Sequence, residues 1–183
     1  MKNATTEQIA AWKEQYGGVW EFPVDDKICY LRDPKMTDFK RAMTAMQRDG
    51  DIAFGEEMLS ALFIDGDLEI RNNDDYFLPA RKKLINFFEY DDAEITPLEN
   101  RQTEITIGEE SCILRVITRH DISTAEKKNP GSKPFVTQEK LFEIVCTKKT
   151  SGFDDKNKAS VRFPLYKALE EIQNQKVATL KKL

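Results

Sequence analysis

The sequence predicts an α+β protein of two modules, a helix-rich module with a β-hairpin over residues 1–96 and a small antiparallel sheet with a C-terminal helix over residues 97–183. Apolar residues recur at helical spacing through most of the first half, whereas short runs with alternating apolar residues prevail in the second. An acidic run before Pro97 separates the two patterns. A chain of 183 residues can bury a core in each module.

The first module opens with a short helix and a hairpin. Thr5 and Gln8 fit a capping box, and Gly17 stops the helix. Its apolar face is formed by Ile9, Trp12 and Tyr16. Residues 19–24 (VWEFPV) and 27–32 (KICYLR) read as two strands joined by a tight Asp-Asp turn. Pro23 predicts that the first strand lies at an edge of its sheet or has a bulge at this position.

Three further helices are expected. The first is expected to begin after Thr37, which would be its N-cap, and to end at Asp49-Gly50. It would bury a stripe formed by Phe39, Ala42, Met43 and Met46. The other two lie within residues 54–90, on either side of an acidic elbow of sequence IDGDLEIRNNDD. We expect Gly66 to supply a turn in this elbow, and Asn73 or Asp74 to cap the second helix.

The second module is expected to contain three strands. Residues 103–107 (TEITI) and 111–119 (SCILRVITR) form a hairpin, and residues 141–147 (LFEIVCT) form the third strand. Residues 120–134 and 148–160 read as long polar loops, and a short strand is expected at 160–163. Pro164 then begins a C-terminal helix with a stripe of Leu165, Leu169 and Ile172 that ends in Lys181 and Lys182.

Composition narrows the class of protein. No apolar run reaches the roughly 20 residues of a membrane span, and the N-terminus lacks the apolar core of a signal peptide. Cys29, Cys112 and Cys146 are expected to be reduced, buried thiols. No internal repeat is evident.

Residues 1–100 carry a net charge of −9 and residues 101–183 a net charge of +5, which favours either separate modules with oppositely charged partners or two solvated surfaces.

No catalytic or metal-binding set is predicted. The chain has no nucleophile elbow, glycine-rich phosphate loop, HExxH or paired CxxC, and its one histidine, His120, reads as a surface residue. The acidic elbow fails the EF-hand spacing, because its sixth and twelfth positions from Asp65 are Ile70 and Tyr76. We therefore expect no enzyme and no cofactor.

A basic segment near the C-terminus raises nucleic-acid binding as a further hypothesis. Cationic side chains alternate there with two phenylalanines, a pattern that can hold phosphates and stack bases. The cations are Lys148, Lys149, Lys156, Lys158 and Arg162, and the aromatic residues are Phe153 and Phe163. Asp154 and Asp155 interrupt the segment, and the pI of about 5.3 favours a solvated loop.

One resemblance bears on function. The chain contains W-K-E-Q-Y-G-G-V-W from Trp12, V-D-D-K-I-C-Y-L-R from Val24, A-L-F-I-D-G-D-L-E-I from Ala61 and D-D-Y-F-L from Asp74. In this order, over residues 8–90, it resembles a family of small tail-assembly-chaperone-like proteins of phage and prophage structural gene clusters. Phe63 stands where tryptophan is expected in such proteins. The resemblance implies no active-site residues.

The resemblance implies a non-catalytic bacteriophage morphogenesis protein that acts through protein–protein contacts. Its partners would be phage structural proteins, with a second copy of the chain as another candidate, and it would act in the host cytoplasm during assembly. The alternatives are a structural virion component, either a capsid or a head–tail subunit whose two long loops serve as contact arms, and a nucleic-acid-associated phage protein. The residues nominated for contact are Phe63, Ile64, Asp65, Asp67 and Phe153, large apolar or acidic side chains beside turns.

Overall fold

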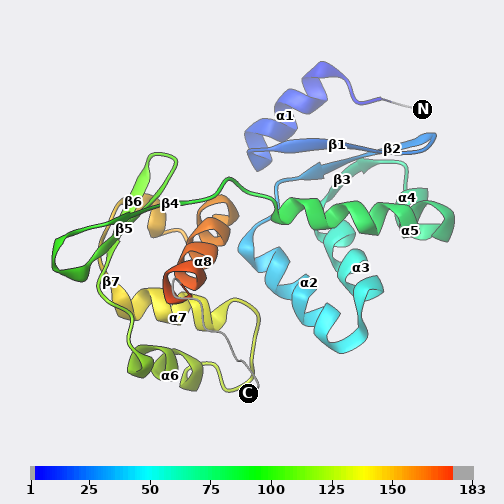
Figure 1. Cartoon of the computed structure of the whole chain (residues 1–183). Coiled ribbons are helices and arrows are strands. Elements are labelled where there is room, and N and C mark those ends of the chain that lie inside the picture. The colour runs from blue at the N-terminus through cyan, green and yellow to red at the C-terminus, as the bar shows by residue number, and fades with distance from the viewer. Residues whose placement is uncertain (1–2, 175–183) are drawn as a thin grey trace, which may run out of the picture. The chain divides into compact units, whose positions relative to one another are not determined.

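A computed structural model describes residues 3–174 and divides the chain into two compact units, unit 1 up to Glu89 and unit 2 from Tyr90 (Figure 1). Each unit combines helices with one antiparallel sheet, so the predicted α+β class is confirmed. The division falls before the expected boundary after residue 96, because Glu94–Pro97 forms the first strand of the second sheet.

Unit 1 is built on a three-stranded sheet of order β1-β2-β3. Its elements are α1 (Thr6–Tyr16), β1 (Val19–Val24), β2 (Lys27–Arg32), α2 (Met36–Asp49), α3 (Asp51–Leu62), β3 (Phe63–Gly66), α4 (Glu69–Asn72), α5 (Asp74–Lys83) and the 3-10 helix η1 (Leu84–Phe88). The capping box of Thr5 with Gln8, the hairpin β1–β2 and the Asn73 cap of α5 are confirmed.

Helices cover both faces of this sheet (Figure 1). On one face, Trp12 of α1 packs against Tyr30 of β2 with ring centroids 5.3 Å apart. Side chains of a strand alternate between faces, so Cys29 and Leu31, both fully buried, point to the opposite face where α2, α3 and α5 lie. The core of unit 1 sits on that second face.

Unit 2 is built on a four-stranded sheet of order β4-β5-β6-β7, with α8 packed on β5. Its elements are β4 (Glu94–Pro97), η2 (Glu99–Arg101), β5 (Thr103–Ile107), β6 (Glu110–Leu114), α6 (Arg119–Lys127), α7 (Val136–Val145), β7 (Cys146–Lys149), η3 (Ser151–Phe153) and α8 (Ala159–Gln173). The hairpin β5–β6 is confirmed, although β6 ends at Leu114 and residue Arg119 already begins α6.

Two expectations for unit 2 are wrong. The segment 120–134 was expected to be a loop but contains α6, which begins at a capping box of Thr118 with Asp121. The segment 141–147 was expected to be a strand, but residues up to Val145 belong to α7 and only Cys146 and Thr147 enter β7. The apolar run LFEIV is short and β-branched, and such runs fit a buried helix as well as a strand.

The remaining differences concern single elements. The acidic elbow is not a turn between helices, because it contributes β3 and the short helix α4. Thr37 lies inside α2, whose capping position is Lys35. The segment 160–163 is helical, and Pro164 lies at the sixth residue of α8 rather than in its first turn. Lys181 and Lys182 lie outside the described residues.

From the hairpin to the third strand, the two units repeat one motif at a constant spacing of 83 residues, which was not recognised in the sequence. Phe22 pairs with Cys29 in the first hairpin and Ile105 with Cys112 in the second, and both members of the pair differ by 83. The following strand keeps the same spacing, since Leu31 pairs with Phe63 and Leu114 with Cys146, each next to a break in register. The motif is therefore β-β-α-α-β-α in both units.

An arginine–aspartate clasp joins the second strand to the next helix in each copy of the motif. Arg32 donates from both terminal nitrogens to Asp38 at 2.8 and 2.9 Å, and Arg115 donates in the same way to Asp121 at 2.8 and 2.7 Å. Each aspartate also accepts from the backbone N–H three residues before it, at Lys35 and Thr118. Because an arginine fork matches a carboxylate in geometry, the clasp fixes where the helix begins.

The units differ at one sheet edge. In unit 2, Thr106 of β5 pairs with Glu94 of β4, whereas in unit 1 the equivalent strand β1 is the edge strand and carries Pro23 at the position of Thr106. Proline has no N–H to donate to a further strand, so it protects an open edge from pairing with another chain.

Replacing Pro23 with threonine is expected to open this edge. The variant restores a backbone donor beside the exposed strand, so it should self-associate with rising concentration, as measured by sedimentation velocity. Pro130→Thr, at an exposed proline of the α6–α7 loop, is the control and should match the original chain. An unchanged sedimentation coefficient for Pro23→Thr would show that Pro23 does not protect the edge.

Candidate functional site

Four of the five residues nominated for contact lie at or beside β3. Phe63, Ile64 and Asp65 belong to strand β3 and not to the turn that was expected there. Phe63 and Ile64 are half-buried, and Asp65 is exposed. Phe63 lies under the guanidinium of Arg71, 5.3 Å from its ring centroid. The Asp67 carboxylate accepts from the Ile28 backbone N–H at 2.9 Å, so it ties β3 to β2.

Phe153 is not an exposed anchor. Its side chain is fully buried in unit 2, where its ring packs 5.7 Å from that of Phe142. The nomination is therefore wrong, and the reason is that residues 151–153 form η3 and turn Phe153 inward instead of continuing a solvated loop.

The exposed apolar surface lies elsewhere in unit 1. All large hydrophobic side chains that are well exposed among residues 3–174 belong to this unit, namely Trp20, Met46, Ile52, Leu68, Leu78 and Ile85. Trp20 is the largest of them and is 52% exposed. The sequence signal for it was the period-two pattern of β1, which places Trp20 on one face of an edge strand.

Trp20 is held in place by two neighbours. Its indole packs edge-to-face on Phe87 with centroids 5.5 Å apart, and its Nε1 donates to Asp33 Oδ1 at 2.6 Å. A large aromatic side chain that is exposed yet fixed loses little conformational entropy when a partner covers it. Trp20, Phe87 and Asp33 are called the Trp20 surface below.

Residues 3–174 contain no group of three or more metal-ligating side chains that could hold a metal ion, and no helix among them is long and apolar enough to cross a membrane. His120 is exposed in the first turn of α6. All three cysteines are free thiols. Burial raises the pKa of Cys29 and of Cys112 to about 12, so both stay protonated at neutral pH.

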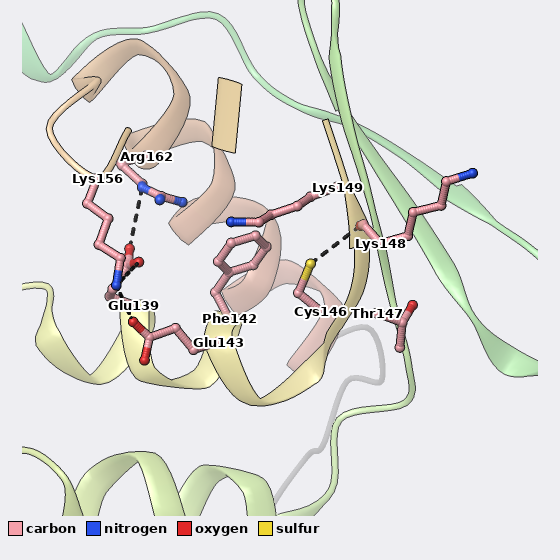
Figure 2. A pocket seen from close by; sticks show the side chains of 9 residues that line it. All are labelled: Glu139, Phe142, Glu143, Cys146, Thr147, Lys148, Lys149, Lys156 and Arg162. Atoms are coloured by element: carbon pink, nitrogen blue, oxygen red, sulfur yellow. Dashed lines mark hydrogen bonds and ion pairs between the residues drawn. The ribbon is translucent and has the colours of Figure 1, made fainter. Parts of the chain in front are cut away.

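Unit 2 contains a pocket of about 350 Å³ between α7, β7 and α8 (Figure 2). The pocket brings together four of the five cationic residues of the basic segment, Lys148, Lys149, Lys156 and Arg162. Glu139 and Glu143 of α7 line it as well, and Phe142 and Cys146 supply its apolar part. The segment thus forms a folded site, not the solvated loop that its composition suggested.

Arg162 and Glu139 form the buried base of the pocket. Arg162 has no exposed surface and Glu139 is 6% exposed. Arg162 Nε lies 3.4 Å from Glu139 Oε2 in a charge contact without hydrogen-bond geometry, and that same oxygen accepts from the Tyr166 hydroxyl at 2.8 Å. Burial, together with the neighbouring Glu139 carboxylate, raises the pKa of Tyr166, so the phenol remains a hydrogen-bond donor.

The guanidinium of Arg162 is only partly satisfied. Its Nη2 donates to the Phe153 carbonyl at 2.9 Å, and Lys149 Nζ donates to the same oxygen at 3.3 Å. Arg162 Nη1 and Glu139 Oε1 are both buried and have no hydrogen-bond partner among the described residues. A buried donor and a buried acceptor therefore remain unused at the base of the pocket.

Lys156, Glu143 and Cys146 also line the pocket. Lys156 pairs with Glu143, which raises the pKa of Lys156. Burial acts to raise the pKa of Glu143, but its hydrogen bonds and ion pairs with Lys140 and Lys156 outweigh burial and lower it, so both partners are charged at neutral pH. Burial raises the pKa of the Cys146 thiol, whose Sγ donates to the Lys148 carbonyl at 3.4 Å. A protonated thiol is a poor nucleophile, so the pocket is equipped for binding rather than for covalent chemistry.

The charge imbalance between the halves is smaller when it is counted by unit. Residues 1–89 hold 12 Lys and Arg against 17 Asp and Glu, a net charge of −5, whereas residues 90–183 hold 16 against 15, a net charge of +1. Unit 2 is thus nearly neutral, and four of its 16 Lys and Arg residues line the pocket. Phe153 and Arg162 are buried and cannot stack on bases, so of the two phenylalanines of the basic segment only Phe163 keeps exposed surface.

Comparisons with family models, with curated proteins and with solved structures each found no significant match to this chain.

Proposed function

We propose that the protein is a non-catalytic assembly protein of bacteriophage morphogenesis that acts through protein–protein contacts in the manner of a tail-assembly chaperone. The phage context rests on the resemblance over residues 8–90. That segment coincides with unit 1, the unit that carries the exposed apolar side chains. The observation that carries the proposal is the exposed and fixed Trp20 on an edge strand.

The Trp20 surface has the features of a contact site. Tryptophan is enriched among residues that dominate binding energy, and here its polar Nε1 is already paired with Asp33, so a partner needs only to cover the ring. Unit 1 carries a net charge of −5, which favours a partner segment with basic residues around an apolar anchor. The proposed partner is such a segment of a phage structural protein.

The structural-subunit alternative loses its main argument. It relied on two long loops as contact arms, but α6 occupies most of the first and η3 lies within the second. Helices that are packed within unit 2 are less suited to reach a neighbouring subunit than free loops are. Transient contact through unit 1 is therefore the favoured function.

Replacing Trp20 with alanine is expected to weaken partner binding by about 30-fold or more, the effect of losing a residue that contributes about 2 kcal/mol to binding. The structural proteins of the source gene cluster would be co-expressed with the chain one at a time, and the affinity of each complex measured by calorimetry. The matched control is Leu68→Ala, because Leu68 is 55% exposed but follows β3 at the opposite sheet edge.

Leu68→Ala should bind within about twofold of the original chain. Equal loss in both variants would move the contact away from the Trp20 surface. If no structural protein of the cluster forms a complex with the original chain, the proposed function is wrong.

A further inference from the structure

The pocket of unit 2 contains a fully buried arginine whose Nη1 donor is unused. Arg162 has no exposed surface, and neither Nη1 nor Nε has a hydrogen-bond partner among the described residues. Leaving a buried charged donor unpaired costs several kcal/mol, so proteins rarely keep such a group without a use for it. Arg162 lines the same pocket as Lys149 and Lys156 (Figure 2).

The pocket also has a surplus of positive charge. Four cationic side chains line it, and three carboxylates oppose them: Glu139 and Glu143 in the lining, and Asp154, which pairs with Lys149 at 2.7 Å. Lys149 Nζ and Arg162 Nη2 converge on one carbonyl oxygen, that of Phe153, so two positive charges lie side by side. A phosphate group carries a charge of about −1.5 to −2 at neutral pH, so it interacts with these cations more strongly than a carboxylate, which carries only one charge. Arginine forks bind phosphate particularly well.

The repeated motif provides an internal comparison. The helices α5 and α8 each contain a proline as their sixth residue, Pro79 and Pro164, and pack on the equivalent strands β1 and β5. When the two helices are aligned on these prolines, the position of Arg162 corresponds in unit 1 to Phe77, which is buried. The motif of unit 1 therefore folds with an apolar residue at this position.

We propose that this pocket binds a phosphate group, either free or carried by a small organic molecule. Arg162 Nη1 and Lys149 Nζ would donate to the phosphate oxygens, with Lys156 at the mouth. The volume of about 350 Å³ is more than a phosphate ion fills and lies within the range of small-ligand sites. Phe142, whose ring lies 5.4 Å from the Arg162 guanidinium, is the aromatic part of the lining. Glu139 Oε1, 3.7 Å from Lys156 Nζ, has no hydrogen-bond partner among the described residues and would accept from a ligand hydroxyl.

The test uses the full chain labelled with ¹⁵N and follows amide shifts while inorganic phosphate, phenyl phosphate or acetate is added at constant ionic strength. We expect saturable phosphate binding with shifts confined to α7, β7 and α8. Acetate should bind at least about tenfold more weakly than phosphate. Tighter binding of phenyl phosphate than of phosphate would assign the site to a phosphate ester, and equal binding would assign it to free phosphate. Shifts scattered over the chain, or acetate as tight as phosphate, would overturn the proposal.

Two variants and a control complete the test. Arg162→Phe copies the residue of unit 1, and Lys149→Gln removes a partly exposed charge without changing the core. Each should weaken phosphate binding by about tenfold or more. Lys133→Gln removes the same charge from an exposed position outside the pocket and should change the affinity by less than about twofold. Unchanged affinity in both Arg162→Phe and Lys149→Gln would contradict the assignment.

Discussion

The variant Asp121→Ala is expected to lower the free energy of unfolding of unit 2 by about 2–3 kcal/mol. The Asp121 carboxylate is 4% exposed and accepts from Arg115, from the Thr118 hydroxyl and from the Thr118 backbone N–H. Its loss removes the Asp121 half of the α6 capping box and leaves Arg115 without its carboxylate partner. Arg115 is 41% exposed and can be rehydrated, so the effect is smaller than for a fully buried ion pair.

Hydrogen exchange followed by mass spectrometry can measure this effect unit by unit. In Asp121→Ala, the amides of α6 and α7 should exchange faster than in the original chain. Unit 1 contains both tryptophans, so its unfolding can be followed by tryptophan fluorescence, and that unfolding curve should be the same in the variant and the original chain. Asp92→Ala is the control, because Asp92 is 72% exposed and makes one surface ion pair with Lys167. Equal effects of the two variants would mean that the clasp does not stabilise unit 2.

The clasp also predicts a pH dependence. Hydrogen bonds from Arg115 and then from Thr118 hold the pKa of Asp121 well below its ordinary value in the folded unit. A depressed folded pKa means that the stabilising contribution is complete above the unfolded value of about 3.9 and is lost as the pH falls below it. Between about pH 4 and pH 2, the original chain should therefore lose more stability than Asp121→Ala does.

Gly66→Ala is expected to destabilise unit 1 by about 3–4 kcal/mol. Gly66 has φ +118°, where a side chain is strained, and an added Cβ would lie 2.5 Å from the Ile28 carbonyl oxygen and 2.6 Å from Cys29 Cα. Both atoms belong to the backbone of β2, so β3 would have to move away from its partner strand. Urea unfolding followed by tryptophan fluorescence measures the change.

The variant Gly50→Ala measures the cost of backbone strain at positive φ without a steric clash of the added Cβ. Gly50 has a comparable φ of +82°, but no atom lies within 4 Å of the position of its Cβ. This variant should cost only about 1 kcal/mol. A similar cost for Gly66→Ala would show that β3 is free to shift and that its register against β2 is not tightly fixed.

The elements that the sequence predicted correctly are those with local signals. The Thr5 capping box, the hairpin of residues 19–32 and the hairpin of β5 and β6 depend on neighbouring residues and on turn chemistry. Among the segments predicted wrongly, α7 contains the short apolar run LFEIV, and only tertiary packing decides between helix and strand there.

The repeated motif was invisible in the sequence for a physical reason. The two copies share Cys29 with Cys112, Leu31 with Leu114, and the clasp residues, but the remaining core positions need only apolar side chains of compatible size. The pocket was missed in part for the same reason. Its basic residues were recognised, but burial of Arg162 depends on α8, where a loop and a strand were expected.

The measurement that tests the proposed function most directly is quantitative mass spectrometry of the chain in lysates of phage-producing cells and in purified particles. An assembly chaperone should be found in the lysate, cross-linked through unit 1 to a structural protein, and be absent from finished particles. Many copies per particle would instead make the chain a structural subunit. Absence of the chain from both particles and cross-linked complexes would contradict a role in phage assembly.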